Sequence, residues 1–168
     1  MILVLFKYKI CRLVKYIYYK NKFKETYYSR DQFWSLLRGI THRQFEAFCC
    51  YLYSEFGYDA QITRATHDGG KDVILKRNGI TTYVECKHYG SKSTVGREIC
   101  QKLLGSCMVD GADSAIVFTT GNINSNAIEC ERKTGMLTIV SFNDIFNMFN
   151  DLDINARSRV LAKTINYR

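Results

Sequence analysis

The chain has 168 residues, of which 46% are hydrophobic and 14% aromatic, so it is long and apolar enough to bury a domain core. Its seven cysteines form an odd set without Cys-x-x-Cys spacing, which argues against a disulfide framework and a structural zinc site and indicates a reducing, cytoplasmic compartment. The formal net charge is +8, and residues 1–30 account for +7 of it, because they hold eight basic residues and one acidic residue.

The first element in chain order is a basic, aromatic-rich N-terminal arm over residues 1–38. Its charge indicates a polyanionic partner, either nucleic acid or an anionic membrane surface. Apolar residues from Phe6 to Ile17 recur at helical spacing between basic residues, which predicts an amphipathic helix. Such a helix contacts a membrane, grips phosphates or docks on the domain core, and the sequence leaves these alternatives open. The run from Ile2 to Phe6 is too short for a signal peptide, and the lysines after it interrupt any membrane span.

A helix, a strand and a loop are predicted next. Thr41 and Gln44 form a capping-box pattern, apolar residues follow at helical spacing, and Gly57 ends the helix. Residues 58–64 have the pattern of a strand, and the paired glycines within residues 66–70 predict a loop.

The stretch from Asp72 to Lys87 predicts a β-hairpin, because its Asn78-Gly79 pair is the strongest short-range signal for a two-residue turn. With that turn, Asp72 faces Glu85 in a non-hydrogen-bonded pair, whose side chains approach closely. Lys87 lies two residues beyond Glu85 and therefore shares its face of the sheet.

The remaining elements alternate between helices and strands. The pattern predicts a helix over residues 95–109, a buried strand over 115–118, a helix from 124 or 125, a strand over 137–140, a helix over 142–149 and a polar, basic C-terminal tail over 151–168. The expected fold is therefore an α/β domain with a mixed β-sheet flanked by helices, in which an αβββαβ core is followed by a C-terminal βα extension.

Two opposed carboxylates call for a cation between them, because like charges directly opposite each other destabilise a sheet. Asp72 and Glu85 are expected to bind one Mg²⁺, with Mn²⁺ as a substitute, and the backbone carbonyl of Cys86 is a candidate third ligand. Such an ion acidifies a bound water and neutralises charge on a phosphate. Lys87 would position or deprotonate the attacking water, or donate to the developing negative charge.

The arrangement Asp72-x(12)-Glu85-x-Lys87 resembles the PD-(D/E)xK nuclease pattern, and its surroundings are similar to the Mrr-type restriction endonuclease branch. The likeness covers residues 39–149, within an expected nuclease domain over residues 39–150. The supporting marks are Phe45-Glu46, Gly57-Tyr58, Asp68-Gly69-Gly70-Lys71-Asp72, Thr119-Thr120-Gly121 and Ala127.

This resemblance implies a restriction-endonuclease-like fold, Mg²⁺ dependence and DNA as substrate. It assigns metal binding to Asp72 and Glu85, a catalytic role to Lys87 and a supporting catalytic role to the Glu46 carboxylate. The chain departs from the family pattern at Lys71, where a small apolar residue is frequent, and at Glu85, where many members have Gln.

Candidate DNA contacts follow the hairpin. Lys92, Arg97, Gln101 and Lys102 are expected to contact the DNA backbone, which fixes register without reading bases. Thr120 precedes a helix start, where backbone N–H groups suit an anion. The same five residues also fit an ordinary solvated face or a simple turn. His67 and His88 flank the site, and each is more often a hydrogen-bonded bystander than a functional group.

The leading hypothesis is an Mg²⁺-dependent endodeoxyribonuclease of a restriction, defence or DNA-processing system. It acts as a homodimer if it cuts both strands, because each strand then needs its own active site. The alternative is a non-catalytic module that binds nucleic acid or a membrane surface through the basic arm, and the nearly neutral charge of residues 31–168 favours it. RNA or branched DNA is a further possible substrate.

Overall fold

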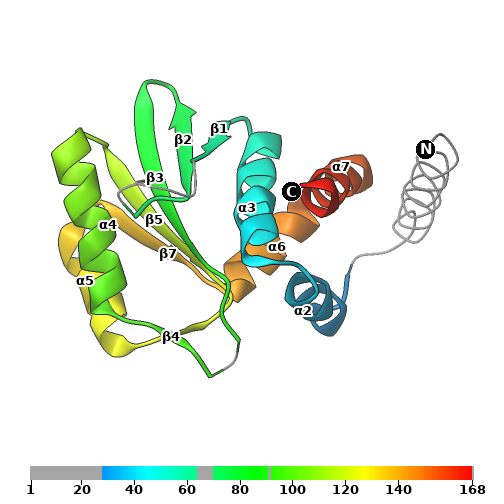
Figure 1. The fold of residues 1–168 in the computed structure, drawn as a ribbon, viewed down its shortest axis with the longest axis horizontal. Coiled ribbons are helices and arrows are strands. Elements are labelled where there is room, and N and C mark those ends of the chain that lie inside the picture. Colours follow the sequence, from blue (N-terminus) through cyan, green and yellow to red (C-terminus); the bar gives the residue numbers. More distant parts are fainter. Residues whose placement is uncertain (1–27, 64–69, 91, 168) are drawn as a thin grey trace, which may run out of the picture.

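A five-stranded mixed sheet forms the centre of the computed structural model, which describes residues 28–63, 70–90 and 92–167 (Figure 1). The strand order is β1-β2-β3-β5-β7, with β1, β2 and β3 antiparallel and β3, β5 and β7 parallel. The elements are α2 (Arg30–Arg38), α3 (His42–Glu55), β1 (Asp59–Ile62), β2 (Val73–Arg77), β3 (Ile80–Lys87), β4 (Thr94–Val95), α4 (Arg97–Asp110), β5 (Ser114–Thr119), β6 (Asn122–Ile123), α5 (Ser125–Thr134), β7 (Leu137–Val140), α6 (Phe142–Asp151) and α7 (Ile154–Asn166). The expected mixed α/β fold is confirmed, whereas the helix expected between Phe6 and Ile17 lies outside the described residues.

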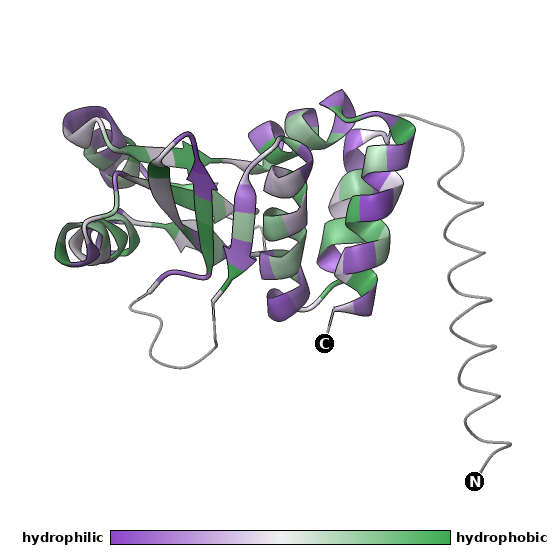
Figure 2. Cartoon of the chain, turned by 90° about the horizontal axis from the view of Figure 1, so that it is seen from above, coloured by the Kyte–Doolittle hydropathy of each residue, from purple (hydrophilic) through white to green (hydrophobic). Residues whose placement is uncertain are grey.

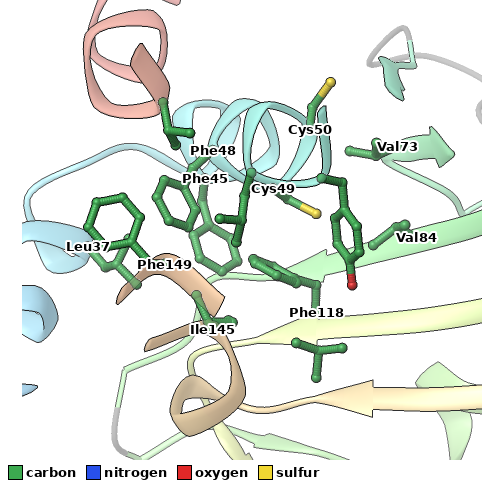
Figure 3. Close-up of a cluster of buried hydrophobic side chains, with 14 of the residues drawn as sticks. Leu37, Phe45, Phe48, Cys49, Cys50, Val73, Val84, Phe118, Ile145 and Phe149 are labelled. Carbon is green, nitrogen blue, oxygen red and sulfur yellow. The ribbon is translucent and has the colours of Figure 1, made fainter. Parts of the chain in front are cut away.

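Helices cover both faces of this sheet. On one face, α4 and α5 pack on Tyr83 and Val117, and on the other, α3 and α6 pack on Val84 and Phe118 (Figure 1). Successive strand residues point to opposite faces, so the two neighbours Tyr83 and Val84 belong to two separate hydrophobic cores. The larger core is aromatic: Figure 3 shows Phe45, Phe48 and Phe149 gathered between α3, α6 and the sheet.

The β2–β3 hairpin has the predicted turn. Asn78 and Gly79 have φ angles of 52° and 79°, the left-handed conformation that a two-residue hairpin turn requires. The register places Arg77 opposite Ile80, as predicted, and continues to Val73 opposite Val84.

The ladder stops there, one pair before Asp72 and Glu85. The Asp72 N–H donates instead to the carbonyl oxygen of Val84 at 2.7 Å, so Asp72 and Val73 both face Val84. This local bulge turns Asp72 out of the regular pairing, and the expected direct opposition of Asp72 and Glu85 is wrong in that detail.

Two terminal segments differ from the sequence-based expectation. The last part of the expected arm forms α2, which buries Phe33 and Leu37 in the larger core. The expected C-terminal tail forms α7, which begins after the N-cap Asp153 and packs against α3. Figure 2 shows α7 beside α3, with hydrophilic and hydrophobic residues mixed along both helices. Three apolar residues of α7 are buried: Ala156, Val160 and Leu161.

The short parallel pair β4–β6 was not predicted either. Among the described residues, no helix is both long and apolar enough to cross a bilayer. The six described cysteines are free thiols.

Candidate active site

Glu85 and Lys87 lie together near the end of β3. The Glu85 side chain is buried, and the residue is 6% exposed. Lys87 lies two residues further along the strand, and its Nζ donates a hydrogen bond to Glu85 Oε1 in an ion pair. The strand alternation that separates Tyr83 from Val84 also places both side chains on the face covered by α4.

Asp72 directly precedes β2, and its side chain contacts the backbone of β3. Its Oδ2 accepts a hydrogen bond from the backbone N–H of Cys86 at 2.7 Å. Cys86 is the residue between Glu85 and Lys87, so the Asp72 carboxylate lies beside the part of β3 that carries both. Beyond the last β2–β3 pair, the Cys86 N–H thus bonds to the Asp72 side chain rather than to a backbone carbonyl of the neighbouring strand. Asp72 and Glu85 are therefore neighbours, as the sequence predicted, although they reach each other through the bulge rather than through direct pairing.

The electrostatics of this pair reflect burial and the two neighbouring charges. Burial raises the pKa of Glu85, the nearby Asp72 carboxylate adds to this, and the hydrogen bond from Lys87 opposes it. For Lys87, burial alone would lower the pKa, but the hydrogen bond and the charge of Glu85 outweigh it and raise the pKa above its ordinary value. Lys87 is therefore held as an ammonium group beside two carboxylates.

The donor set suits a hard divalent cation. Within the described ranges, no group of three or more His, Cys, Asp and Glu side chains is arranged to hold a metal. Mg²⁺ usually takes one or two protein carboxylates and completes its shell with waters and substrate phosphates, so the pair Asp72 and Glu85 fits it. The Cys86 carbonyl as a third ligand stays a prediction.

Glu46 approaches from α3. Its side chain is 16% exposed and forms an ion pair with Arg43. Burial raises the pKa of the Cys86 thiol, and the charges of Asp72 and Glu46 contribute to that shift, so Glu46 lies near the same part of β3. Cys86 packs on the larger core, and Glu46 therefore comes from the opposite face to Glu85. A catalytic role for Glu46 stays a prediction.

Lys102 lies closer to the site than the sequence suggested. A methyl group added to Gly70 would lie 2.7 Å from Lys102 Cε, so the lysine packs over the segment that leads into Asp72. The positive charge of Lys102 also lowers the pKa of Glu85, although burial has the larger, opposite effect. This side chain extends from α4 to the candidate active site.

Sequence reasoning did not identify the contacts of Lys71. Its Nζ lies 2.6 Å from Asp110 Oδ2 at the end of α4 and 4.4 Å from the centre of the Tyr83 ring. The Tyr83 hydroxyl donates to the same Asp110 oxygen at 3.2 Å. The lysine that departs from the family pattern therefore joins the segment before Asp72 to α4.

The other predicted DNA contacts lie in different surroundings. Lys92 and Gln101 are exposed, and Arg97 is exposed and paired with Glu129 at 3.1 Å. Thr120 is buried, and its hydroxyl donates to the Tyr89 carbonyl and accepts from the Tyr89 N–H, both at 2.9 Å. Those bonds argue against a phosphate contact through the Thr120 side chain.

Of the two histidines that flank the site in the sequence, His88 and His67, the structure describes only His88. His88 Nε2 lies 2.9 Å from the Leu37 carbonyl oxygen, and its ring stacks on Phe45 with 4.8 Å between ring centres. It is a half-buried, hydrogen-bonded residue, which agrees with the bystander interpretation. His67 lies outside the described residues.

The mixed sheet with its flanking helices is the fold of the restriction endonucleases. Residues 37–149 match the model of the Mrr catalytic family, described as "Restriction endonuclease". This match covers more than half of the chain, so the chain belongs to that family.

The chain is also similar to one curated protein sequence and to solved structures of two restriction endonucleases. The uncharacterised protein y4cE of Sinorhizobium fredii (strain NBRC 101917 / NGR234) is 33% identical over 91 residues, which are 52% of this chain and 23% of that protein. The DNA modification-dependent restriction endonuclease AspBHI is similar in structure, with a TM-score of 0.58 and 18% identity over 87% of this chain and 42% of its own. The MspJI restriction endonuclease, solved with a 27-mer oligonucleotide, gives a TM-score of 0.56 and 15% identity over 74% of this chain and 32% of its own.

At these identities the two solved structures show the fold. This chain spans less than half the length of each of the three proteins.

Proposed function

We propose that this chain is a divalent-metal-dependent endodeoxyribonuclease that hydrolyses DNA phosphodiester bonds in a restriction, defence or DNA-processing system. The observation that carries the proposal is the meeting of Asp72 and Glu85 beside Lys87, on a fold of the restriction endonuclease family. DNA as substrate is supported by AspBHI, described as a DNA modification-dependent restriction endonuclease, and by the oligonucleotide in the MspJI structure.

Asp72 and Glu85 would hold Mg²⁺ or Mn²⁺, with the Cys86 carbonyl as the candidate third ligand. When bound, such an ion supplies Lewis-acid chemistry, because it lowers the pKa of a coordinated water and offsets negative charge on the phosphate. The burial of Glu85 keeps competing water away from this carboxylate and strengthens its attraction to a cation.

Lys87 acts in this proposal as a donor rather than as a base. Its Nζ donates a hydrogen bond to Glu85 Oε1 in an ion pair, and this pairing favours the protonated ammonium form. It would therefore orient the attacking water or the phosphate and stabilise the negative charge that develops on the phosphate oxygens. Lys102, which lies against Gly70, would contact the DNA backbone near this site.

The test is cleavage of supercoiled and linear duplex DNA by the full chain with Mg²⁺, Mn²⁺ or a chelator. We expect metal-stimulated cleavage, and we expect Asp72→Ala, Glu85→Gln and Lys87→Ala each to reduce its rate by at least about a hundredfold. Lys76→Ala is the matched control, because this lysine is exposed on β2 of the same hairpin. Melting curves confirm that each variant is folded.

Full activity in all three variants would contradict the proposal. The binding-module alternative would instead be supported if the protein bound DNA without cleaving it under any divalent metal, and if deletion of residues 1–30 abolished that binding.

Labelled RNA and branched junctions in the same assay decide the substrate class. Sedimentation analysis with and without DNA tests the homodimer expected for cutting both strands, and vesicle flotation tests membrane contact by the arm.

A further inference from the structure

Arg43 lies where three elements of the fold meet. It stands in the first turn of α3, and its Nη1 donates to Glu46 on the next turn. Its Nη2 donates to the Thr63 carbonyl oxygen, just after β1, at 2.7 Å. The same nitrogen lies 3.4 Å from the hydroxyl of Tyr167, which follows α7, and the guanidinium carbon lies 5.6 Å from the centre of that ring.

Thr63 continues the connection to Asp72. Its N–H donates to the Asp72 carbonyl oxygen at 2.9 Å. Its hydroxyl lies 2.8 Å from the Lys71 carbonyl oxygen and 3.1 Å from that of Asp72. One residue therefore separates the Arg43 guanidinium from the backbone of a proposed metal ligand, at the position where Asp72 leaves the β2–β3 ladder.

The end of α7 braces this arrangement from outside the segment that matches the family. Gln44 Nε2 donates to the Ile165 carbonyl oxygen at 3.2 Å, which joins the first turn of α3 to the last turn of α7. The Tyr167 ring also lies edge-on to Tyr51, with 6.4 Å between ring centres.

We propose that Arg43 is a positioning residue, which fixes Glu46 directly and the Asp72 backbone through Thr63, with Tyr167 as its brace. This inference rests on the proposed function and adds a residue to it. Arginine suits the role because its planar guanidinium presents donors in several directions at once, whereas a lysine ammonium is a compact point charge. Lysine at this position retains the pairing with Glu46 but cannot also span to Thr63 and Tyr167.

The experiment compares the full-length wild type with Arg43→Gln, Arg43→Lys and Tyr167→Phe. Mn²⁺ affinity is measured by calorimetry without DNA, kcat and KM by DNA cleavage, and stability by melting temperature. Loss of a group that orients a metal ligand typically weakens metal binding or activity by about 10- to 100-fold. We expect Arg43→Gln to weaken Mn²⁺ binding by about that factor and to lower kcat more than it changes KM. Arg43→Lys should fall between Arg43→Gln and the wild type, and Tyr167→Phe should have a smaller effect because it retains the ring.

Arg159→Gln is the matched control. Arg159 also joins α7 to α3, through Glu55 at the other end of α3, with 2.5 Å between the closest nitrogen and oxygen. This variant should keep the Mn²⁺ affinity of the wild type even if its melting temperature falls.

Three outcomes would overturn the inference. Unchanged Mn²⁺ affinity and kcat in Arg43→Gln, with an active wild type, would overturn it and leave the proposed function intact. Equal losses of affinity in Arg43→Gln and Arg159→Gln, in proportion to melting temperature, would reduce Arg43 to a general structural role. A wild type that neither binds Mn²⁺ nor cleaves DNA would overturn the proposed function and this inference together.

Discussion

Glu85 combines burial with proximity to another carboxylate, and each of these disfavours its ionised form. Lys87 pairs with Glu85, and the charge of Lys102 also acts on Glu85, so two ammonium groups lie near the two acids. The reason to expect a divalent ion is therefore the ligand chemistry of two neighbouring carboxylates, which offer the oxygen atoms that Mg²⁺ takes from a protein. Lys102 adds positive charge where a DNA phosphate would approach.

A pH prediction concerns His88, which lies behind the site. Burial lowers its pKa below the ordinary value, with the neighbouring His42 adding to the shift and the bond to the Leu37 carbonyl opposing it. The unfolded chain therefore takes up a proton at a higher pH than the folded protein does. The free energy of unfolding should decrease as the pH falls from about 7.5 through the unfolded pKa, about 6.5, to below the folded pKa.

Urea unfolding at pH about 7.5 and about 5.5 measures this loss of stability. His88→Gln, which cannot titrate but retains a side-chain donor for Leu37, should lose less stability between the two conditions than the wild type. An equal loss in both proteins would show that other groups cause the pH dependence.

At the level of individual residues, the sequence predicted the contents of the candidate site but not its supporting contacts. Asp72, Glu85 and Lys87 could be placed together because a two-residue turn determines which hairpin residues meet. The bulge at Asp72 could not be foreseen, because the turn residues determine the pairing next to the turn but not where the ladder stops, and here the Asp72 N–H donates to the Val84 carbonyl oxygen. Arg43 was missed for a similar reason, since its partners come from β1 and the C-terminus.

At the level of elements, α2 belongs to the domain rather than to the basic arm. Phe33 is fully buried and packs against aromatic rings of α3 and α6, with 4.9 Å between its ring centre and that of Phe149. Phe33→Ala should lower the free energy of unfolding by about 3–5 kcal/mol, the usual cost of removing a buried aromatic ring. Chemical denaturation of the full chain measures this difference.

Ser35→Ala is the control for Phe33→Ala, because Ser35 is exposed on the same helix and its replacement should change stability by less than about 0.5 kcal/mol. A comparably small effect of Phe33→Ala would mean that α2 does not contribute to the cooperative core.

The helix α7 shows what local patterns fail to reveal. Its buried residues Ala156, Val160 and Leu161 follow helical spacing, but Arg157 and Arg159 between them and Lys163 after them give the segment a polar composition. This short stripe is buried because α7 packs on α3 and joins the larger core, a contact that the local pattern does not contain. The strands β4 and β6 have two residues each, too short to produce a recognisable alternation.

At the level of the whole molecule, the order of helices and strands was largely predictable, because the two periodicities of the hydrophobic residues differ and the turns carry clear signals. The mixed sheet then brings the ends of β2 and β3 together, with β5 parallel to β3 beside them. The first and last parts of the described chain, α2 and α7, enclose the larger core with α3 and α6. The fold thus supports the proposed site from segments on both sides of the family match.

The central claim is that Asp72 and Glu85 share one divalent cation beside Lys87. The most direct measurement is a crystal structure of the full chain with Mn²⁺ and duplex DNA, in which anomalous scattering locates the ion. We expect one manganese peak at coordination distance, about 2 Å, from oxygens of both carboxylates, with a DNA phosphate in the same shell. A bound duplex with no manganese between these two residues, or with manganese held by other residues alone, would contradict it.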